Sequence, residues 1–153
     1  MTENIKVIAT NRKASFEYFL MEKFEAGLVL HGSEIKSIRA GQVSIKEAYV
    51  DVQNGESAWL VEAHIAPYEH AGKFFNHEPK RKRRLLLHKK QIRELWNNVR
   101  IKGMTVVPTR LYLKDGRAKL EIALAKGKKA YDKRATIAKR DEARSNERAT
   151  RVR

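Results

Sequence analysis

The chain has 153 residues, enough for one domain with a single hydrophobic core. It carries 33 Lys and Arg against 18 Asp and Glu, a formal net charge of +15, and it contains no cysteine. The lack of cysteine excludes disulfides and thiolate metal sites. The sequence shows no signal-peptide core and no apolar stretch long enough to span a membrane. We therefore expect a soluble cytoplasmic protein without membrane association.

The positive charge is concentrated in two segments. Residues 80–93 hold eight basic residues and no acidic one, and residues 126–153 hold eleven basic and four acidic residues. The remaining residues hold fourteen of each sign and are neutral as a set. A charged segment is usually only a solvated surface, but two concentrated segments beside a neutral remainder favour binding to an acidic polymer.

The first half of the chain predicts strands around one short helix. Residues 16–30 are rich in aromatic and branched side chains and predict one or two strands, with a bend near Glu25. Ser33 is expected to cap a short helix that Gly41 ends. An Asn-Gly pair at 54–55, between the alternating segments YVDVQ and SAWLVEA, predicts a β-hairpin.

The second half contains the clearest helix and a second hairpin. Residues 88–102 predict a helix that ends at Gly103, because four apolar residues follow the helical spacing: Ile92, Leu95, Trp96 and Val99. The segments MTVVP and TRLYL predict a strand that Pro108 interrupts or confines to an edge. The Asp-Gly pair at 115–116 then turns the chain into the alternating strand AKLEIALA.

About six strands and two to three helices predict a mainly β fold. We expect a small antiparallel β-barrel of the oligonucleotide/oligosaccharide-binding (OB) type over residues 1–125, because an open sheet would leave long edges exposed. Residues 126–153 have few large apolar side chains and many good helix formers. They are expected to form a basic tail that is disordered when free and helical on a suitable surface.

No catalytic or metal-binding pattern stands out. The five histidines lack metal-ligand spacing, and the segment AKGKK lacks the glycine and hydroxyl positions of a phosphate loop. No serine or carboxylate pair lies in a recognisable catalytic context. We expect a protein that is not an enzyme and that holds neither a metal nor a cofactor.

The segment HEPKRKRRLLLHKKQ indicates RNA binding. Five basic residues, Lys80 to Arg84, precede three leucines that can end a buried strand. The leucines would hold the basic side chains outward as a rigid ridge facing RNA phosphates, which are recognised by shape and charge. The sequence KRKRR alone also matches a nuclear-import signal.

Five segments together resemble the family of bacterial SsrA-binding proteins, also called small protein B. They occur in the family order: NRKASFEYFL, FEAGLVLHGSEIKSIRAG, HEPKRKRRLLLHKK, TVVPTRLYLKDG and ALAKGKKAYDKR. The resemblance implies an OB barrel that binds the tRNA-like domain of transfer-messenger RNA and delivers it to stalled ribosomes for trans-translation. It also implies a monomer whose tail approaches the decoding centre and probes the empty mRNA channel. The alternative is a general RNA-binding protein without tail-dependent function.

The resemblance also assigns residues to each partner. It implies RNA contacts from Asn11, Arg12, Lys13, Phe16, Glu25, Lys36, Arg39, Arg81, Arg83, Arg84, Leu86 and His88. It implies ribosome contacts from the tail residues Lys126, Lys128, Lys129, Asp132, Lys133 and Arg134. One departure affects this set, because the family usually has Arg-His where this chain has Ser15-Phe16. Phe16 keeps a stacking face but loses the hydrogen bonds of a histidine.

The helix predicted for the bound tail can be tested with proline. An Ala138→Pro substitution should cost about 3 kcal/mol in the bound helix. Peptide tagging on stalled ribosomes should fall sharply, while binding to transfer-messenger RNA remains at the parental level. Tagging at the parental rate would show that the tail acts as an extended tether rather than as a helix.

Overall fold

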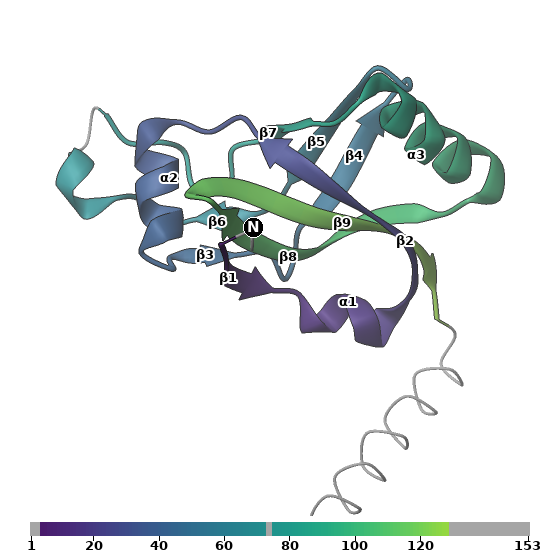
Figure 1. Ribbon diagram of the computed structural model, residues 1–153, viewed down its shortest axis with the longest axis horizontal. Helices are drawn as coiled ribbons and strands as arrows, with labels where there is room; N and C mark the ends of the chain where they lie inside the picture. Colours follow the sequence, from purple (N-terminus) through teal and green to yellow (C-terminus); the bar gives the residue numbers. More distant parts are fainter. Residues whose placement is uncertain (1–3, 73–74, 129–153) are drawn as a thin grey trace, which may run out of the picture.

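The computed structural model describes residues 4–72 and 75–128 as a strongly bent antiparallel sheet with three α-helices around it (Figure 1). The longer strands are β1 (Ile5–Thr10), β2 (Tyr18–Leu28), β4 (Tyr49–Gln53), β5 (Ser57–Val61), β7 (Arg83–Leu86), β8 (Thr105–Lys114) and β9 (Arg117–Gly127). The helices are α1 (Arg12–Glu17), α2 (Gly32–Arg39) and α3 (Lys89–Lys102), with a 3-10 turn, η1 (Glu69–Ala71). Two short strands, β3 (Val43–Ser44) and β6 (His64–Ile65), pair with each other.

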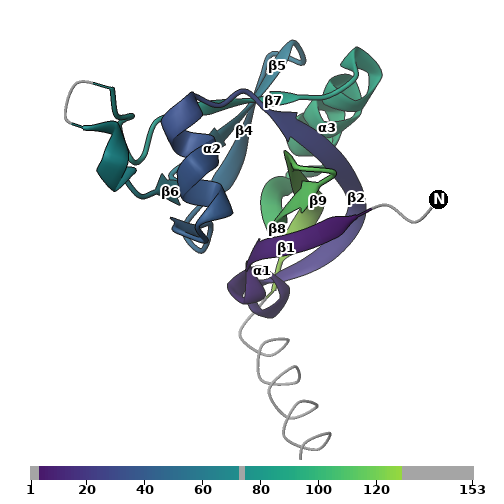
Figure 2. The ribbon, with the colours of Figure 1, turned by 60° about the vertical axis from the view of Figure 1, so that its left-hand side comes forward.

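The mainly β, antiparallel prediction is confirmed, and the structure is more open than a closed barrel. The seven longer strands form one sheet in the order β1-β8-β9-β2-β7-β5-β4, so β1 and β4 are its edges. The sheet curls until β4 faces β8 across the core, which Figure 2 shows from the side. Within the described residues, β1 and β4 do not pair with each other. The expected closure into a barrel is therefore incomplete.

Irregular pairing gives the sheet its curvature. The register shifts between Val7 and Ala9 in β1, between Leu20 and Lys23 in β2, and between Pro108 and Arg110 in β8. Such bulges bend a strand and increase its twist. Pro108 therefore produces a bulge inside one continuous strand rather than a break between two. The core lies inside the bend and includes Ile38, Leu60, Leu95, Leu120 and Ile122.

The predicted hairpins and the long helix are confirmed, whereas two local predictions were wrong. Helix α3 spans residues 89–102 and ends at Gly103, whose φ is 64°. Helix α2 begins two residues earlier than expected, after His31, whose backbone N–H donates to Glu34. Ser33 lies inside this helix, and its hydroxyl bonds to His77 Nδ1 instead (2.8 Å). Residues 16–17, predicted as strand, belong to α1.

A buried ionic cluster joins α2 to the segment that leads into β7. The carboxylate of Glu34, fully buried, accepts hydrogen bonds from Arg83 Nε (2.6 Å) and from Arg81 Nη2 (2.5 Å). Arg83 also donates to the carbonyls of Ala63 (2.7 Å) and Pro79 (3.0 Å). Burial alone would raise the pKa of Glu34, but the hydrogen bonds from Arg81, the His31 N–H and Arg83 hold this pKa below its usual value.

This cluster corrects the expectation that Lys80 to Arg84 form an outward ridge. Arg83 has no exposed surface, because strand β7 alternates and turns it toward Glu34. Arg81 keeps 29% of its side-chain surface exposed and bonds to the same carboxylate. Arg84, which lies between two inward residues, is exposed. A chain with five basic residues in a row therefore presents only some of them to a partner.

The cluster makes stability sensitive to Glu34. A Glu34→Gln substitution leaves the buried charge of Arg83 without its counterion and should lower the free energy of unfolding by about 3–5 kcal/mol. Because the pKa of Glu34 is lowered in the folded protein, its contribution is present above the unfolded-state pKa and is lost as the pH falls through the folded value.

Urea denaturation of the variant and of a matched control measures this effect. Glu47→Gln removes an exposed carboxylate that pairs with Lys13 (3.3 Å), and it should change stability by less than about 1 kcal/mol. Equal losses from the two substitutions would show that the buried cluster contributes no more than a surface ion pair.

Candidate nucleic-acid interface

Strand β7 places its side chains alternately inside and outside the fold. Arg83 and Leu85 point into the core, and Arg84 and Leu86 point outward, with 56% of Leu86 exposed. The next residues begin α3, where His88 is the N-cap and its backbone N–H donates to Gln91 (3.0 Å). The helix cap therefore fixes where His88 lies relative to β7.

Four of the expected RNA-contacting residues meet at one groove of about 780 Å³. Glu25 comes from β2, Arg84 and Leu86 from β7, and His88 from the start of α3. Two further cations, Lys89 and Lys119, line the same groove. Elements that are distant in the sequence thus bring cations, apolar side chains and the carboxylates of Glu25 and Glu56 to a single concave surface.

A second groove adjoins the first along Gly27, Leu86 and Lys119, which line both. Its further lining includes Arg39 from α2, Arg117 at the start of β9, and Gly116 in the β8–β9 turn. That turn points toward α2 in Figure 1, and Arg39 Nη2 lies 3.4 Å from the Gly116 carbonyl. We call the two grooves together the basic face.

Lys36 lies beside the basic face, on the exposed side of α2, and its amine lies 5.5 Å from the centre of the Tyr68 ring.

Glu25 is one of two carboxylates that line the basic face, and Glu56 is the other. Glu25 Oε2 accepts a hydrogen bond from the Tyr112 hydroxyl (2.5 Å), and Glu25 Oε1 lies 3.4 Å from Lys114 Nζ. The hydrogen bond from Tyr112, assisted by Lys114 and Lys119, holds the pKa of Glu25 below its usual value. Glu25 is therefore an ionised acceptor surrounded by cations.

The expected residues on α1 lie elsewhere. Asn11 is buried and caps α1, because its Oδ1 accepts from the Ala14 N–H (3.2 Å) while its Nδ2 donates to the Pro108 carbonyl (2.9 Å). Arg12 is exposed and Phe16 is partly buried. Glu25 lies seven residues beyond the start of β2, roughly 20 Å along the strand at the usual rise per residue.

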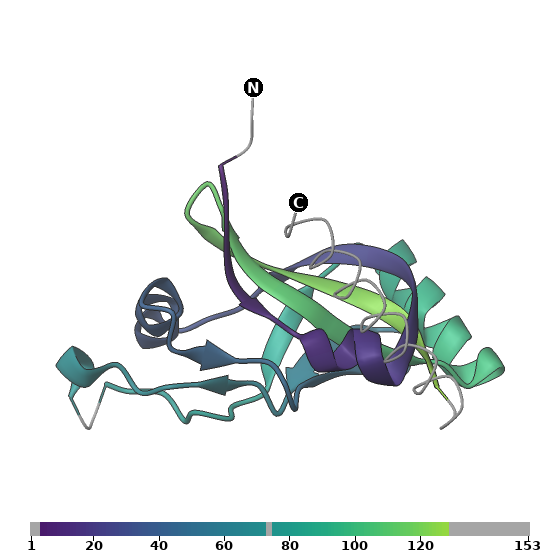
Figure 3. The ribbon, with the colours of Figure 1, turned by 90° about the horizontal axis from the view of Figure 1, so that it is seen from below.

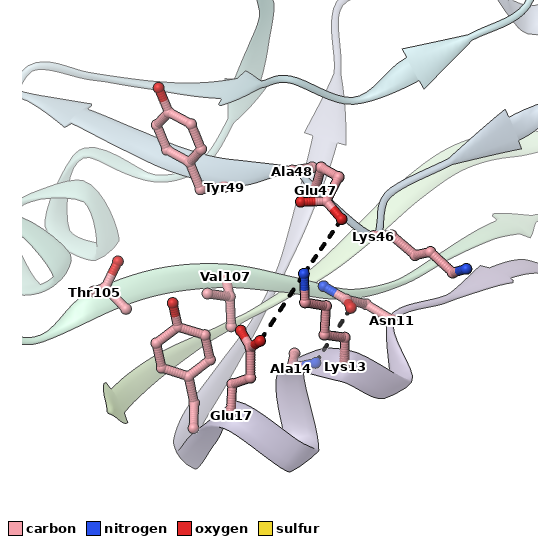
Figure 4. Close-up of a pocket in the computed structure, with 11 residues that line it drawn as sticks. Asn11, Lys13, Ala14, Glu17, Lys46, Glu47, Ala48, Tyr49, Thr105 and Val107 are labelled. Carbon is pink, nitrogen blue, oxygen red and sulfur yellow. Dashed lines mark hydrogen bonds and ion pairs between the residues drawn. The ribbon is translucent and has the colours of Figure 1, made fainter. Parts of the chain in front are cut away.

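Lys13 belongs to a separate pocket of about 170 Å³ between α1 and the segment before β4. Figure 4 shows its amine between the carboxylates of Glu17 (3.9 Å) and Glu47 (3.3 Å). These carboxylates offset the charge of Lys13, so this pocket is less positive than its lysines alone suggest.

Arg81 and Arg83 also lie away from the groove beside β7. Arg83 is enclosed by Glu34 and backbone carbonyls, as described above. Arg81 lines a different pocket, which is near the start of α2 and includes His31 and Phe75. Of the three arginines in the basic run, the groove receives only Arg84.

Of the six tail residues expected to contact the ribosome, two lie within the described part of the chain, which ends at residue 128. Lys126 is still part of β9, opposite Phe19 in β2. Lys128 follows the strand, and its Nζ donates to the Ser15 carbonyl (3.1 Å) and lies 5.1 Å from the centre of the Phe19 ring. Figure 3 shows the end of β9 with α1 nearby. Lys129, Asp132, Lys133 and Arg134 lie outside the described residues.

Sequence reasoning did not select Lys89, Arg117 and Lys119, although the structure places all three on the basic face. A signal for Lys119 was present, because it alternates with Ala118 and Leu120, which face the core. Within residues 4–72 and 75–128, the structure contains no group of three or more His, Asp or Glu that could hold a metal ion. No helix in these ranges is long and apolar enough to cross a membrane.

The sequence of almost the whole chain is similar to that of known proteins. A family model described as SmpB protein matches residues 8–152. An SsrA-binding protein of Roseiflexus castenholzii is 57% identical over 97% of this chain and 93% of its own length. An SsrA-binding protein of Desulforudis audaxviator is 56% identical over 95% of this chain and 94% of its own length.

A solved structure is similar as well. A chain from "tmRNA-SmpB: a journey to the center of the bacterial ribosome" is 44% identical and superposes with a TM-score of 0.64. The match covers 79% of this chain and 84% of that chain.

Proposed function

The chain belongs to the SmpB family, and on this premise we propose that it binds the tRNA-like domain of transfer-messenger RNA and delivers it to stalled ribosomes for trans-translation. The observation that carries the proposal is the convergence of Glu25, Arg84, Leu86 and His88 on one groove, with Lys89 and Lys119 beside them. The sequence resemblance assigns the first four of these residues to RNA independently of their positions in the fold.

The basic face has the chemistry that a folded RNA requires. Arg84, Lys89 and Lys119 can neutralise backbone phosphates, which supplies affinity without reading base identity. Leu86, with 56% of its surface exposed between the two grooves, can pack against a sugar or an unstacked base. His88 can donate or accept a hydrogen bond at the edge of the groove.

The curved antiparallel sheet serves in this proposal as an OB-type scaffold. A rigid scaffold suits recognition by shape, because the basic side chains are held in place before the RNA arrives. Arg39 and Lys36 on α2 extend the contact surface beyond β7. Arg12 and Phe16 on α1 contact RNA at the other end of β2.

Residues 126–153 form the ribosome-directed part of the proposed adaptor. Lys126 lies in β9 and Lys128 directly follows this strand, and Lys129, Asp132, Lys133 and Arg134 come next in the sequence. The protein acts in the cytoplasm as a monomer, by binding two partners rather than by catalysis.

The groove can be tested through Arg84. An Arg84→Ala substitution should weaken binding to the tRNA-like domain by about tenfold, the size of a lost charge-assisted hydrogen bond. It should also reduce the slope of log affinity against log salt by roughly 0.7–0.9, the loss of one phosphate contact. Fluorescence anisotropy over a range of salt concentrations measures both quantities.

Lys102→Ala is the matched control. Lys102 is exposed in the last turn of α3, about 20 Å from the helix start at the usual helical rise. This control should leave the affinity and the salt slope close to those of the parent. If Arg84→Ala behaved like Lys102→Ala, the groove would not face the RNA.

A further inference from the structure

Tyr112 is a buried tyrosine beneath Glu25, one of the two carboxylates that line the basic face. Only 3% of its surface is exposed, and its hydroxyl donates to Glu25 Oε2 (2.5 Å). We infer that Tyr112 is a positioning residue of the RNA interface: it fixes the Glu25 carboxylate as an acceptor for a hydrogen-bond donor of the RNA. The inference rests on the proposed function and adds to it a residue that touches no RNA.

The sheet topology explains how Tyr112 reaches Glu25. Strand β9 lies between β8, which carries Tyr112, and β2, which carries Glu25. Tyr112 is opposite Lys119 and Glu25 is opposite Glu121 in the register of β9. Two strands in a sheet that flank a third are separated by about 9.6 Å. The long tyrosine side chain therefore crosses β9 diagonally to meet the carboxylate.

A second set of contacts holds the Tyr112 ring. The guanidinium of Arg110 lies 5.0 Å from the centre of the ring, and its Nε lies 3.4 Å from Glu121. The Thr109 hydroxyl donates to the same carboxylate of Glu121 (2.6 Å). These contacts keep the ring in one position, so the hydroxyl can aim at Glu25 before any partner binds.

The hydrogen bond from Tyr112 makes the two carboxylate oxygens of Glu25 different in their surroundings. Oε2 is occupied by Tyr112, whereas Oε1 faces Lys114 at 3.4 Å, and 40% of the Glu25 side chain remains exposed. An ionised carboxylate repels phosphate but accepts from a base amino group or a 2′-hydroxyl. Oε1 is thus the atom available to such a donor, and Tyr112 prevents Glu25 from turning fully toward Lys114.

The ionisation of the pair agrees with this geometry. The hydrogen bond from Tyr112 is the largest cause that lowers the pKa of Glu25, and it outweighs partial burial, which would raise it. Burial and the hydrogen bond to Glu25 raise the pKa of Tyr112, so its hydroxyl keeps the proton that it donates. The other charged or titratable groups around Glu25 are Lys114, Lys119, Glu121, Glu56, Arg84, His88 and Lys89.

A double-mutant cycle on the full-length chain tests the inference. Tyr112→Phe keeps the ring and removes the hydroxyl, and Glu25→Gln keeps the size and removes the charge. Tyr112→Phe should weaken binding to a transcript of the tRNA-like domain by about three- to tenfold at pH 7. In the Glu25→Gln background it should have little further effect, because the charged acceptor that Tyr112 positions is already absent. Tyr49→Phe, in the pocket beside α1, is the matched control and should bind like the parent.

The pH profile separates positioning from a purely structural role. Since Tyr112 lowers the pKa of Glu25, Tyr112→Phe should raise that pKa, and the acidic loss of RNA binding should move to higher pH. Titration of the RNA itself is common to both proteins and cancels in the comparison. Carbon-13 NMR of the Glu25 carboxyl in the free proteins measures the same shift without RNA.

Each outcome has a definite meaning. If the two single losses multiplied in the double variant, Tyr112 would act independently of Glu25, and the inference would be wrong. An unchanged Glu25 pKa in folded Tyr112→Phe would overturn it as well. If the parent protein failed to bind the tRNA-like domain, the proposed function would fail, whatever the NMR titration showed.

Discussion

The buried contact between Glu34 and Arg83 sets the orientation on which the basic face depends. Two charges removed from water are tolerable only when they pair closely and satisfy their remaining hydrogen bonds, which these do. Since β7 alternates, fixing Arg83 inward fixes Arg84 and Leu86 outward. A shift of one residue in the register of β7 would turn Arg84 into the core, where it would not reach Glu34 in the geometry of Arg83. The same shift would expose Leu85. The ion pair thus contributes register more than affinity for any partner.

The proposed RNA interface is assembled from both halves of the bent sheet. Strand β7 and the start of α3 supply Arg84, Leu86 and His88, whereas β2 and β9 supply Glu25 and Lys119. The Tyr112 hydroxyl connects the β8 strand to the same groove. Because strand pairing and the start of α3 hold the backbone of each contributor, little backbone conformational entropy would be lost when RNA binds.

The positions of basic residues in the sequence did not predict which basic side chains are accessible to a partner. Arg83 belongs to a basic segment of the sequence but is enclosed by Glu34, and Lys13, which follows Arg12, lies between two carboxylates. Lys119 lies in an ordinary alternating strand, yet it lines both grooves. The electrostatic surface is therefore a result of folding, in which near neighbours offset some charges and leave others exposed.

The sequence by itself determined the features that depend on local periodicity and turn chemistry. These include the Asn-Gly hairpin, helix α3 with its stop at Gly103, and the alternating strand β9. It also determined the family, through five motifs in order, and with it four residues of the groove. Only the tertiary structure decided that the Asn11 side chain bonds to the Pro108 carbonyl, that Arg83 is buried against Glu34, and that Tyr112 holds Glu25. The partners in these contacts are 49 to 97 residues apart in the chain, so no local pattern encodes them. The openness of the sheet was likewise decided by the relative positions of β1 and β4, which bulges in several strands set together.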